Sequence, residues 1–483
     1  MTHGARYANY IGGRRMAPAS GIYLKDVNPG DTPDVIGEFP NSGPEDAARA
    51  MEAARNAFPA WAGLPASSRG EFLRRAASIL EQRATEVARD LVREQGKPAR
   101  YAKAEVLTAI ALLRESAGLA QVPAGQVLAA QGGEALVLTQ RLPIGPWAVI
   151  SSWLDPIAGP LRLAAPALAF GNTVALNPSE WTPLAAWNIL QCLEEAGLPA
   201  GVFNVVFGEA SMAGRFLGAH AECAAVAFEG NPGMAAAMVQ WCTAPFRQVH
   251  AETHGWSVLV VMEGANGARA AQDAVRGAFA CAGQRPYRVS MVLVDAQILD
   301  EFLERVAEAA SALPLGDAHD DHAEVGPMIS REARDRMLAW IKKTQQSGGR
   351  LITGGCVPGD ERFARGAYLT PAVLLLSDLR RLDLPADLLG PCVLIAPFKE
   401  MATVQETVHG MVGCTAASLY TGDLDEALSF VGELRQRWVS LNRLPGDLFP
   451  YGVLRCDAGA DVVAMYTRAR TLSVTAASVH PEG

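Results

Sequence analysis

The sequence predicts an α/β protein with two doubly wound domains. Its 483 residues exceed the size of one ordinary core, and at about 150 residues per domain we expect about three units. Short apolar runs of strand length alternate with amphipathic stretches of helix length, which is the pattern of a parallel sheet covered by helices on both faces. A second series of this kind begins near residue 258, so two such sheets are expected.

The first part of the chain is expected to be largely helical. Apolar side chains recur there at helical spacing, and Gly96 with Pro98 gives a stop signal after a long helical stretch. Three helices are expected, at residues 44–60, 67–94 and 103–119. After a turn at residues 131–133, the segment Ala135–Thr139 is predicted to be a strand on one side of a hairpin arm.

The alternation that defines the first sheet follows this arm. Strands are expected at residues 147–151, 173–176, 202–206 and 224–228, with helices at about 156–170, 183–196 and 210–219. The second series begins with strands at residues 258–261 and 291–294.

Charge and composition exclude several classes of protein. A net charge of -9 leaves no basic stripe for phosphates, so nucleic acid is not an expected partner. No apolar run approaches the roughly 18 residues of a membrane span, and the N-terminus lacks the apolar core of a signal peptide, so a cytoplasmic protein without membrane contact is expected. The eight cysteines include no C-x-x-C pair, which favours reduced thiols over disulfides or a metal site.

Motifs spread over nearly the whole chain resemble those of the aldehyde dehydrogenase superfamily and occur in the family's order. They are Tyr10–Gly13, Leu168–Thr173, Pro178–Glu180, Val325–Ile329, Gly366–Pro371, Leu389–Pro391 and Pro450–Gly452. The resemblance implies an aldehyde dehydrogenase-like α/β fold, with two doubly wound domains plus a small β oligomerisation arm. It assigns residues 1–122 and 144–251 to a dinucleotide-binding-type domain, 252–460 to a catalytic-type domain, and 123–143 and 461–483 to the arm.

The family's catalytic devices are largely absent from the matching positions. Residues 279–287 resemble the nucleophile loop, in which Gly-Gln and one variable residue precede the catalytic cysteine, and here Pro286 stands at the cysteine's place. Leu154 matches the asparagine of a Trp-Asn-Phe-Pro motif that forms the oxyanion hole. Proline has neither a thiolate nor a backbone N–H, and leucine has no side-chain donor, so the nucleophile and both oxyanion donors are missing. Glu252 stands where the family has its general base.

The positions that bind the cofactor in the family are mixed. Glu180 could still bond ribose hydroxyls, whereas Asn177 replaces a lysine and brings no charge for a 2′-phosphate, which disfavours NADP. Gly230 belongs to the loop that matches Phe-Thr-Gly-Ser, and its neighbour Glu229 would repel a pyrophosphate if it pointed inward. Asp387 stands where the family has a glutamate on the nicotinamide ribose. The resemblance thus implies weak NAD binding or none.

Two further residues lie close to these motifs. Cys281 precedes Pro286 by five residues, and a free cysteine at a helix end is most often an inert core residue. His254 follows Glu252 by two, which does not by itself establish a shared site. Neither residue is assigned a catalytic role.

The elements for assembly are retained. In the family, a hairpin arm and a C-terminal strand extend one subunit's sheet into its neighbour's, and here they match Ala135–Thr139 and Thr471–Thr475. Exposed strand edges invite pairing with another chain, so a homodimer, or a hetero-oligomer with an active aldehyde dehydrogenase, is expected. The alternative is that both strands pack within their own subunit.

Three functions stay open at this point. The favoured one is a catalytically inactive aldehyde dehydrogenase-like protein that acts as a structural or regulatory subunit. The others are an NAD-dependent aldehyde oxidoreductase that uses substituted residues, and a ligand-sensing module.

Overall fold

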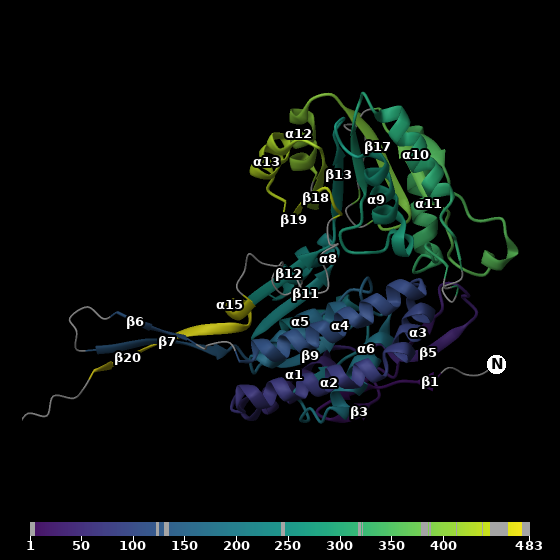
Figure 1. Cartoon of the computed structure of the whole chain (residues 1–483). Coiled ribbons are helices and arrows are strands. Elements are labelled where there is room, and N and C mark those ends of the chain that lie inside the picture. The colour runs from purple at the N-terminus through teal and green to yellow at the C-terminus, as the bar shows by residue number, and fades with distance from the viewer. Residues whose placement is uncertain are drawn as a thin grey trace, which may run out of the picture.

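The computed structural model shows two lobes, each built around a β-sheet, and a narrow arm that projects from the N-terminal lobe (Figure 1). It describes residues 5–121, 125–129, 135–242, 247–316, 322–377, 388–411, 413–436, 438–444 and 462–475, together with Asp320 and Pro385.

The first lobe contains a seven-stranded sheet in which five neighbouring strands are parallel and two further strands are added at one edge by antiparallel pairing. In sheet order the strands are β12 (Gln248–Thr253), β11 (Ala225–Gly230), β8 (Pro146–Ile150), β9 (Thr173–Asn177), β10 (Phe203–Val205), β2 (Asn9–Ile11) and β3 (Arg14–Met16). A small sheet of β1 (Ala5–Arg6), β5 (Val35–Pro40) and β4 (Tyr23–Val27) accompanies it.

Helices cover both faces of this sheet. Successive strand residues point to opposite sides, so each buried strand presents apolar side chains to the helices on both faces. Trp147 and Val149 of β8 pack into a core with α2, α4, α5 and α6, whereas Ala148 and Ile150 pack with α1, α7 and α8. The helices are α1 (Pro44–Ala62), α2 (Ala66–Gln82), α3 (Ala84–Gln95), α4 (Ala99–Leu119), α5 (Ala158–Ala169), α6 (Pro183–Glu195), α7 (Arg215–Ala219) and α8 (Pro232–Cys242).

The second lobe repeats this plan with a parallel sheet that has one antiparallel edge strand. Its strands, in sheet order, are β15 (Arg350–Thr353), β16 (Ala372–Leu375), β17 (Cys392–Phe398), β14 (Met291–Asp295), β13 (Trp256–Val261), β18 (Cys414–Tyr420) and β19 (Trp438–Leu441). The helices are α9 (Gly267–Phe279), α10 (Leu299–Ser311), α11 (Arg331–Gln346), α12 (Met401–Gly410) and α13 (Leu424–Glu433). Two doubly wound α/β domains are thus confirmed, while the domain boundaries stay a prediction.

The arm is a three-stranded antiparallel sheet of β6 (Gly125–Leu128), β7 (Ala135–Pro143) and β20 (Thr467–Thr475). All nine residues of β7 pair with β20, so the two expected strands pair with each other within one chain. Helix α15 (Val462–Tyr466) anchors the base of the arm, where the Tyr466 ring lies 4.8 Å from that of Trp147. The outer part of the arm touches no other element in Figure 1.

Several elements differ from the sequence-based expectation. The helix expected at residues 67–94 is two helices, because Arg83 (φ −92°, ψ 5°) leaves the helical conformation between α2 and α3. The helix expected at residues 103–119 begins earlier, directly after Pro98. Residues 210–219 form a π-helical turn, Ala210–Gly214, followed by α7. The expected turn at residues 131–133 lies outside the described residues.

Membrane-spanning helices, metal sites and disulfides can be examined only in the part of the chain that the structure describes. Among the helices that the structure describes, none has the apolar length that a bilayer crossing requires. The described histidines, cysteines and acidic residues include no group of three or more arranged to hold a metal ion. The seven cysteines in this part of the chain are free thiols.

A buried carboxyl pair makes the stability of the first lobe depend on pH. The Asp26 and Glu94 carboxyl groups are both buried and interact with each other, and both Glu94 oxygens accept backbone N–H groups from Leu184 and Ala185 at the start of α6. Burial raises the pKa of Asp26 to about 7, and burial together with Asp26 raises the pKa of Glu94 well above its usual range. The folded protein therefore keeps protons that the unfolded chain releases at lower pH.

We expect Asp26→Asn to stabilise the protein at alkaline pH. The stabilisation that comes from the raised pKa of Asp26 is complete below the unfolded value near 4 and is lost as the pH rises through about 7. The variant does not titrate there, so its free energy of unfolding should exceed that of the parent by roughly 2–4 kcal/mol above pH 7 and by little near pH 4. Urea titrations across this range measure the difference. Asp335→Asn, at an exposed carboxylate, is the control, and parallel curves for the parent and Asp26→Asn would contradict the prediction.

Candidate functional site

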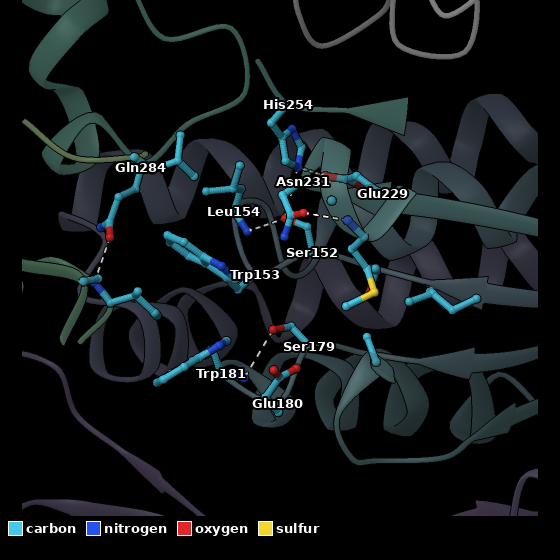
Figure 2. A pocket seen from close by; sticks show the side chains of 18 of the residues that line it. Ser152, Trp153, Leu154, Ser179, Glu180, Trp181, Glu229, Asn231, His254 and Gln284 are labelled. Carbon is cyan, nitrogen blue, oxygen red and sulfur yellow. Dashed lines mark hydrogen bonds and ion pairs between the residues drawn. The ribbon is translucent and has the colours of Figure 1, made fainter. Parts of the chain in front are cut away.

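A cavity of about 270 Å³ lies between the two lobes. The first lobe contributes the carboxyl ends of β8, β9 and β11, and the second contributes Gln284, the start of α11 and Leu388–Leu389. The chain continues from β8 to β9 and β10 on one side, whereas β11 and β12 lie on the other. The cavity therefore lies where the strand order reverses, which is the usual ligand position in open α/β sheets. Figure 2 shows its polar and aromatic wall.

The loop after β8 is held by buried charges from α3 and α4. The Lys97 ammonium donates to the Leu154 carbonyl at 3.0 Å and to Asp155 Oδ1 at 3.0 Å, and it also pairs with Glu105. The Gln95 amide donates to the carbonyls of Trp153 and Leu154 at 2.8 Å each. This network fixes the loop, so the Leu154 side chain stays in the cavity wall with no donor to offer.

The segment that carries Pro286 is anchored by its glutamine and glycine. Gln284 Oε1 accepts the Ile329 N–H at 2.7 Å, and its amide donates to the Pro327 carbonyl at 3.2 Å. Gly283 has φ +66°, and a Cβ there would lie 2.1 Å from the Gly390 carbonyl oxygen, so only glycine fits. Pro286 follows in a turn and does not line the cavity.

Cys281 does not replace the missing thiolate. It precedes Gly283 in a left-handed turn (φ 55°) and is 4% exposed. Burial raises the pKa of Cys281 to about 11, so the group stays a neutral thiol at physiological pH. It is not part of the cavity lining.

Glu252, at the general-base position, is part of a cluster of charged side chains. Its carboxylate pairs with the Arg162 guanidinium of α5 and lies 3.0 Å from His250 Nε2. Arg162 also pairs with Glu229 at 2.9 Å. Glu229 and Glu252 are direct neighbours on β11 and β12, and two like charges so placed would repel without the arginine. Glu252 does not line the cavity.

Three residues of this wall form one hydrogen-bonded group. His254 Nε2 lies 3.2 Å from Ser152 Oγ and 3.3 Å from Glu229 Oε1 (Figure 2). Because the hydroxyl and the carboxylate share one ring nitrogen, the group lacks the geometry of a Ser–His–acid triad, in which they occupy opposite ring nitrogens. Glu229 has room because Gly159 faces it, and a Cβ there would lie 2.7 Å from Glu229 Oε2.

The structure separates the residues expected to bind the cofactor. Glu180 and Gly230 line the cavity. Asn177 is fully buried behind it and donates to the carbonyls of Val206 and Gly208 at 3.0 and 2.9 Å. Asp387 lies outside the described residues.

The start of α8 offers few free donors to a phosphate. A helix N-terminus binds anions through its unpaired N–H groups. Here Pro232, the first helical residue, has no N–H, and the Met234 N–H is taken by Asn231 Oδ1 at 2.8 Å. The buried Glu229 carboxylate lies just before this turn. These residues do not fit the pyrophosphate of a dinucleotide, although Glu180 fits a hydroxyl-bearing ribose.

Sequence reasoning overlooked Arg162, which holds the two carboxylates. A signal was present, since Arg162 is the one charged residue between Pro156 and Thr173 in a helix of otherwise apolar residues. Such an arginine is buried only when acidic groups meet it. Ser152 and Trp181 of the wall were also overlooked, and their residue types alone gave no signal.

The chain belongs to the aldehyde dehydrogenase family, whose model matches residues 17–451. It is 32% identical over 442 residues to the alpha-ketoglutaric semialdehyde dehydrogenase of Bacillus subtilis (strain 168), covering 92% of this chain and 91% of the relative. It is 30% identical to the 2-aminomuconic semialdehyde dehydrogenase of Bos taurus, with 96% and 97% covered.

Solved structures give the same result for the fold. PnpE from Pseudomonas sp. WBC-3 superposes with a TM-score of 0.91 at 28% identity, covering 99% of both chains. PnpE in complex with nicotinamide adenine dinucleotide gives 0.91 at 28% identity, with 97% of each chain covered. The predicted aldehyde dehydrogenase-like fold is thus confirmed.

Proposed function

We propose that this chain is a catalytically inactive, cytoplasmic member of the aldehyde dehydrogenase family that serves as a structural or regulatory subunit. It assembles with itself or with an active aldehyde dehydrogenase, and it binds NAD weakly or not at all. The main support is the set of residues at the family's three catalytic positions: Pro286, Leu154, and Glu252, which forms an ion pair with Arg162.

Each position lacks what aldehyde oxidation requires. Pro286 provides neither a thiolate nor an N–H donor, and Leu154 provides no side-chain donor for an oxyanion. Loss of one oxyanion donor costs about 2.7–4 kcal/mol of transition-state stabilisation. Glu252 is 7% exposed, its carboxylate pairs with the Arg162 guanidinium, and it does not line the cavity.

A direct assay tests the absence of activity. The purified chain, given NAD and a panel of aldehydes that includes semialdehydes, is expected to show no NADH formation above the protein-free rate. The double variant Pro286→Cys, Leu154→Asn is expected to stay inactive, because the Glu252 carboxylate still forms an ion pair with Arg162. Robust turnover by the unmodified chain would reject the inactive-subunit proposal in favour of an oxidoreductase that uses substituted residues.

A ligand-sensing role is the second candidate, and one observation favours it. The cavity persists although the catalytic groups beside it are gone, and in its wall His254 contacts both Ser152 and Glu229. A subunit of this kind would respond to a ligand without transforming it.

A further inference from the structure

The cavity contains a carboxylate that no cation neutralises. Glu180 follows β9 and lines the cavity, and no lysine, arginine or histidine in the described part of the chain forms an ion pair with it. Burial, with a smaller effect of Glu209, raises the pKa of Glu180 above its usual range. A half-buried carboxylate that forms no ion pair favours either a proton or a cationic ligand.

Aromatic side chains lie beside this carboxylate. Trp181 is the next residue and is 44% exposed, and both Trp181 and Trp153 line the same cavity as Glu180 (Figure 2). The faces of indole rings attract cations through their quadrupole. An ammonium group within reach of Glu180 would also contact an aromatic face.

A second polar atom of the wall lacks a partner. The Ser151 hydroxyl is buried, with the residue 5% exposed, and it forms no hydrogen bond although Ser151 lines the cavity. Buried hydroxyls are nearly always hydrogen-bonded, but the Ser151 oxygen has almost no accessible surface, so a ligand in the cavity reaches it only after a shift of the wall. Ile150, Phe228 and Met234 provide an apolar surface for the rest of such a ligand.

The other charged groups of the wall leave this corner negative. Glu229 is already paired with Arg162 and His254. Arg336 of α11, on the opposite lobe, is exposed at the cavity. Pro232 and the capped Met234 N–H leave little for a phosphate to bind. A small cation suits this wall better than an anion does.

We propose that the cavity binds a small organic cation, an amine carried on an apolar or aromatic body, between the Glu180 carboxylate and the indoles of Trp153 and Trp181. This goes beyond the proposed function, because binding requires neither catalysis nor assembly. It also separates the ligand of this chain from a dinucleotide, whose charge has the opposite sign.

An isosteric series of probes tests the sign of the charge. Benzylamine, benzyl alcohol and benzoate have nearly the same shape and carry one positive, no and one negative charge at neutral pH. Titrated into the full-length protein and followed by calorimetry and Trp fluorescence, benzylamine is expected to bind saturably and at least tenfold more tightly than benzyl alcohol, while benzoate shows no saturation. Benzyl alcohol or benzoate binding as tightly as benzylamine would overturn the proposal, as would the absence of saturable benzylamine binding.

Variants locate the binding to the carboxylate. Glu180→Gln is expected to weaken benzylamine binding about tenfold and to leave benzyl alcohol unchanged. Glu195→Gln, at an exposed position on α6, is the matched control and should change neither. Affinity for benzylamine should fall as the pH is lowered through the raised pKa of Glu180, because protonation removes the charge. An unchanged affinity for benzylamine in Glu180→Gln would overturn the assignment. The NADH assay measures aldehyde oxidation, so its outcome for the proposed function does not depend on this binding test.

Discussion

In the proposed assembly, replacing Leu472 by aspartate is expected to leave the protein as monomers. One face of the arm is apolar and exposed, with Val127 72%, Leu136 50%, Leu472 40% and Val474 46% exposed. The strand registers place Leu472 opposite Leu138 and Val474 opposite Leu136, so these side chains share a face. A charge in the middle of that face would cost several kcal/mol on burial, which is a loss of about 100-fold or more in association.

The opposite face of the same strand supplies the control. Ser473 is the next residue of the strand; it is exposed, and its side chain points to the opposite face from that of Leu472. Ser473→Asp therefore adds the same charge on the other face and should leave assembly intact. Light scattering after size exclusion, at several protein concentrations, measures the mass. A monomeric parent protein, or equal dissociation of both variants, would contradict the role of this face.

Replacing Arg162 by leucine is expected to destabilise the first lobe strongly. The Arg162 side chain is 13% exposed, and those of Glu229 and Glu252 are 2% and 9% exposed. Without the guanidinium two buried carboxylates face each other across neighbouring strands. Removal of one partner from a buried ion pair typically costs about 3–5 kcal/mol.

Two comparisons separate this effect from a simple loss of packing. The triple variant Arg162→Leu, Glu229→Gln, Glu252→Gln removes the charges together and should recover most of the stability. Arg74→Leu, which breaks an exposed pair with Glu71, should change the free energy of unfolding by about 0.5 kcal/mol at most. Urea titrations at neutral pH provide the values. If the triple variant is as unstable as Arg162→Leu, packing rather than charge explains the loss.

The sheets were predictable because their signals are local. Alternating apolar runs such as residues 147–151 and 258–261 mark buried strands wherever they occur, and the structure places strands there. The break at Arg83 was missed because no glycine or proline marks it, and both flanking stretches keep helical periodicity. Element type follows from pattern, whereas such a boundary depends on packing of the two helices.

The candidate site was predictable only in outline. Motif matches assigned Leu154 to the oxyanion hole and Glu180 and Gly230 to the cofactor site, and the structure places all three in the wall of one cavity. The ion cluster was not predictable, because Arg162, Glu229 and Glu252 are far apart in the chain and meet through the β11–β12 register and the position of α5. Whether a carboxylate acts as a base depends on such neighbours, and sequence spacing does not reveal them.

The short connection between β12 and β13 links the cavity to any movement of the two lobes relative to each other. Strand β12 ends at Thr253 and β13 begins at Trp256, so His254 and Gly255 alone join the two sheets at this point. Gly255 lies so close to Gly413 that a Cβ would be 1.8 Å from its carbonyl oxygen, while His254 reaches back to Ser152 and Glu229. Any rotation of one lobe against the other must twist these two residues. A molecule that fixes His254 would therefore stiffen this connection, and occupancy of the cavity would narrow the range of angles between the lobes.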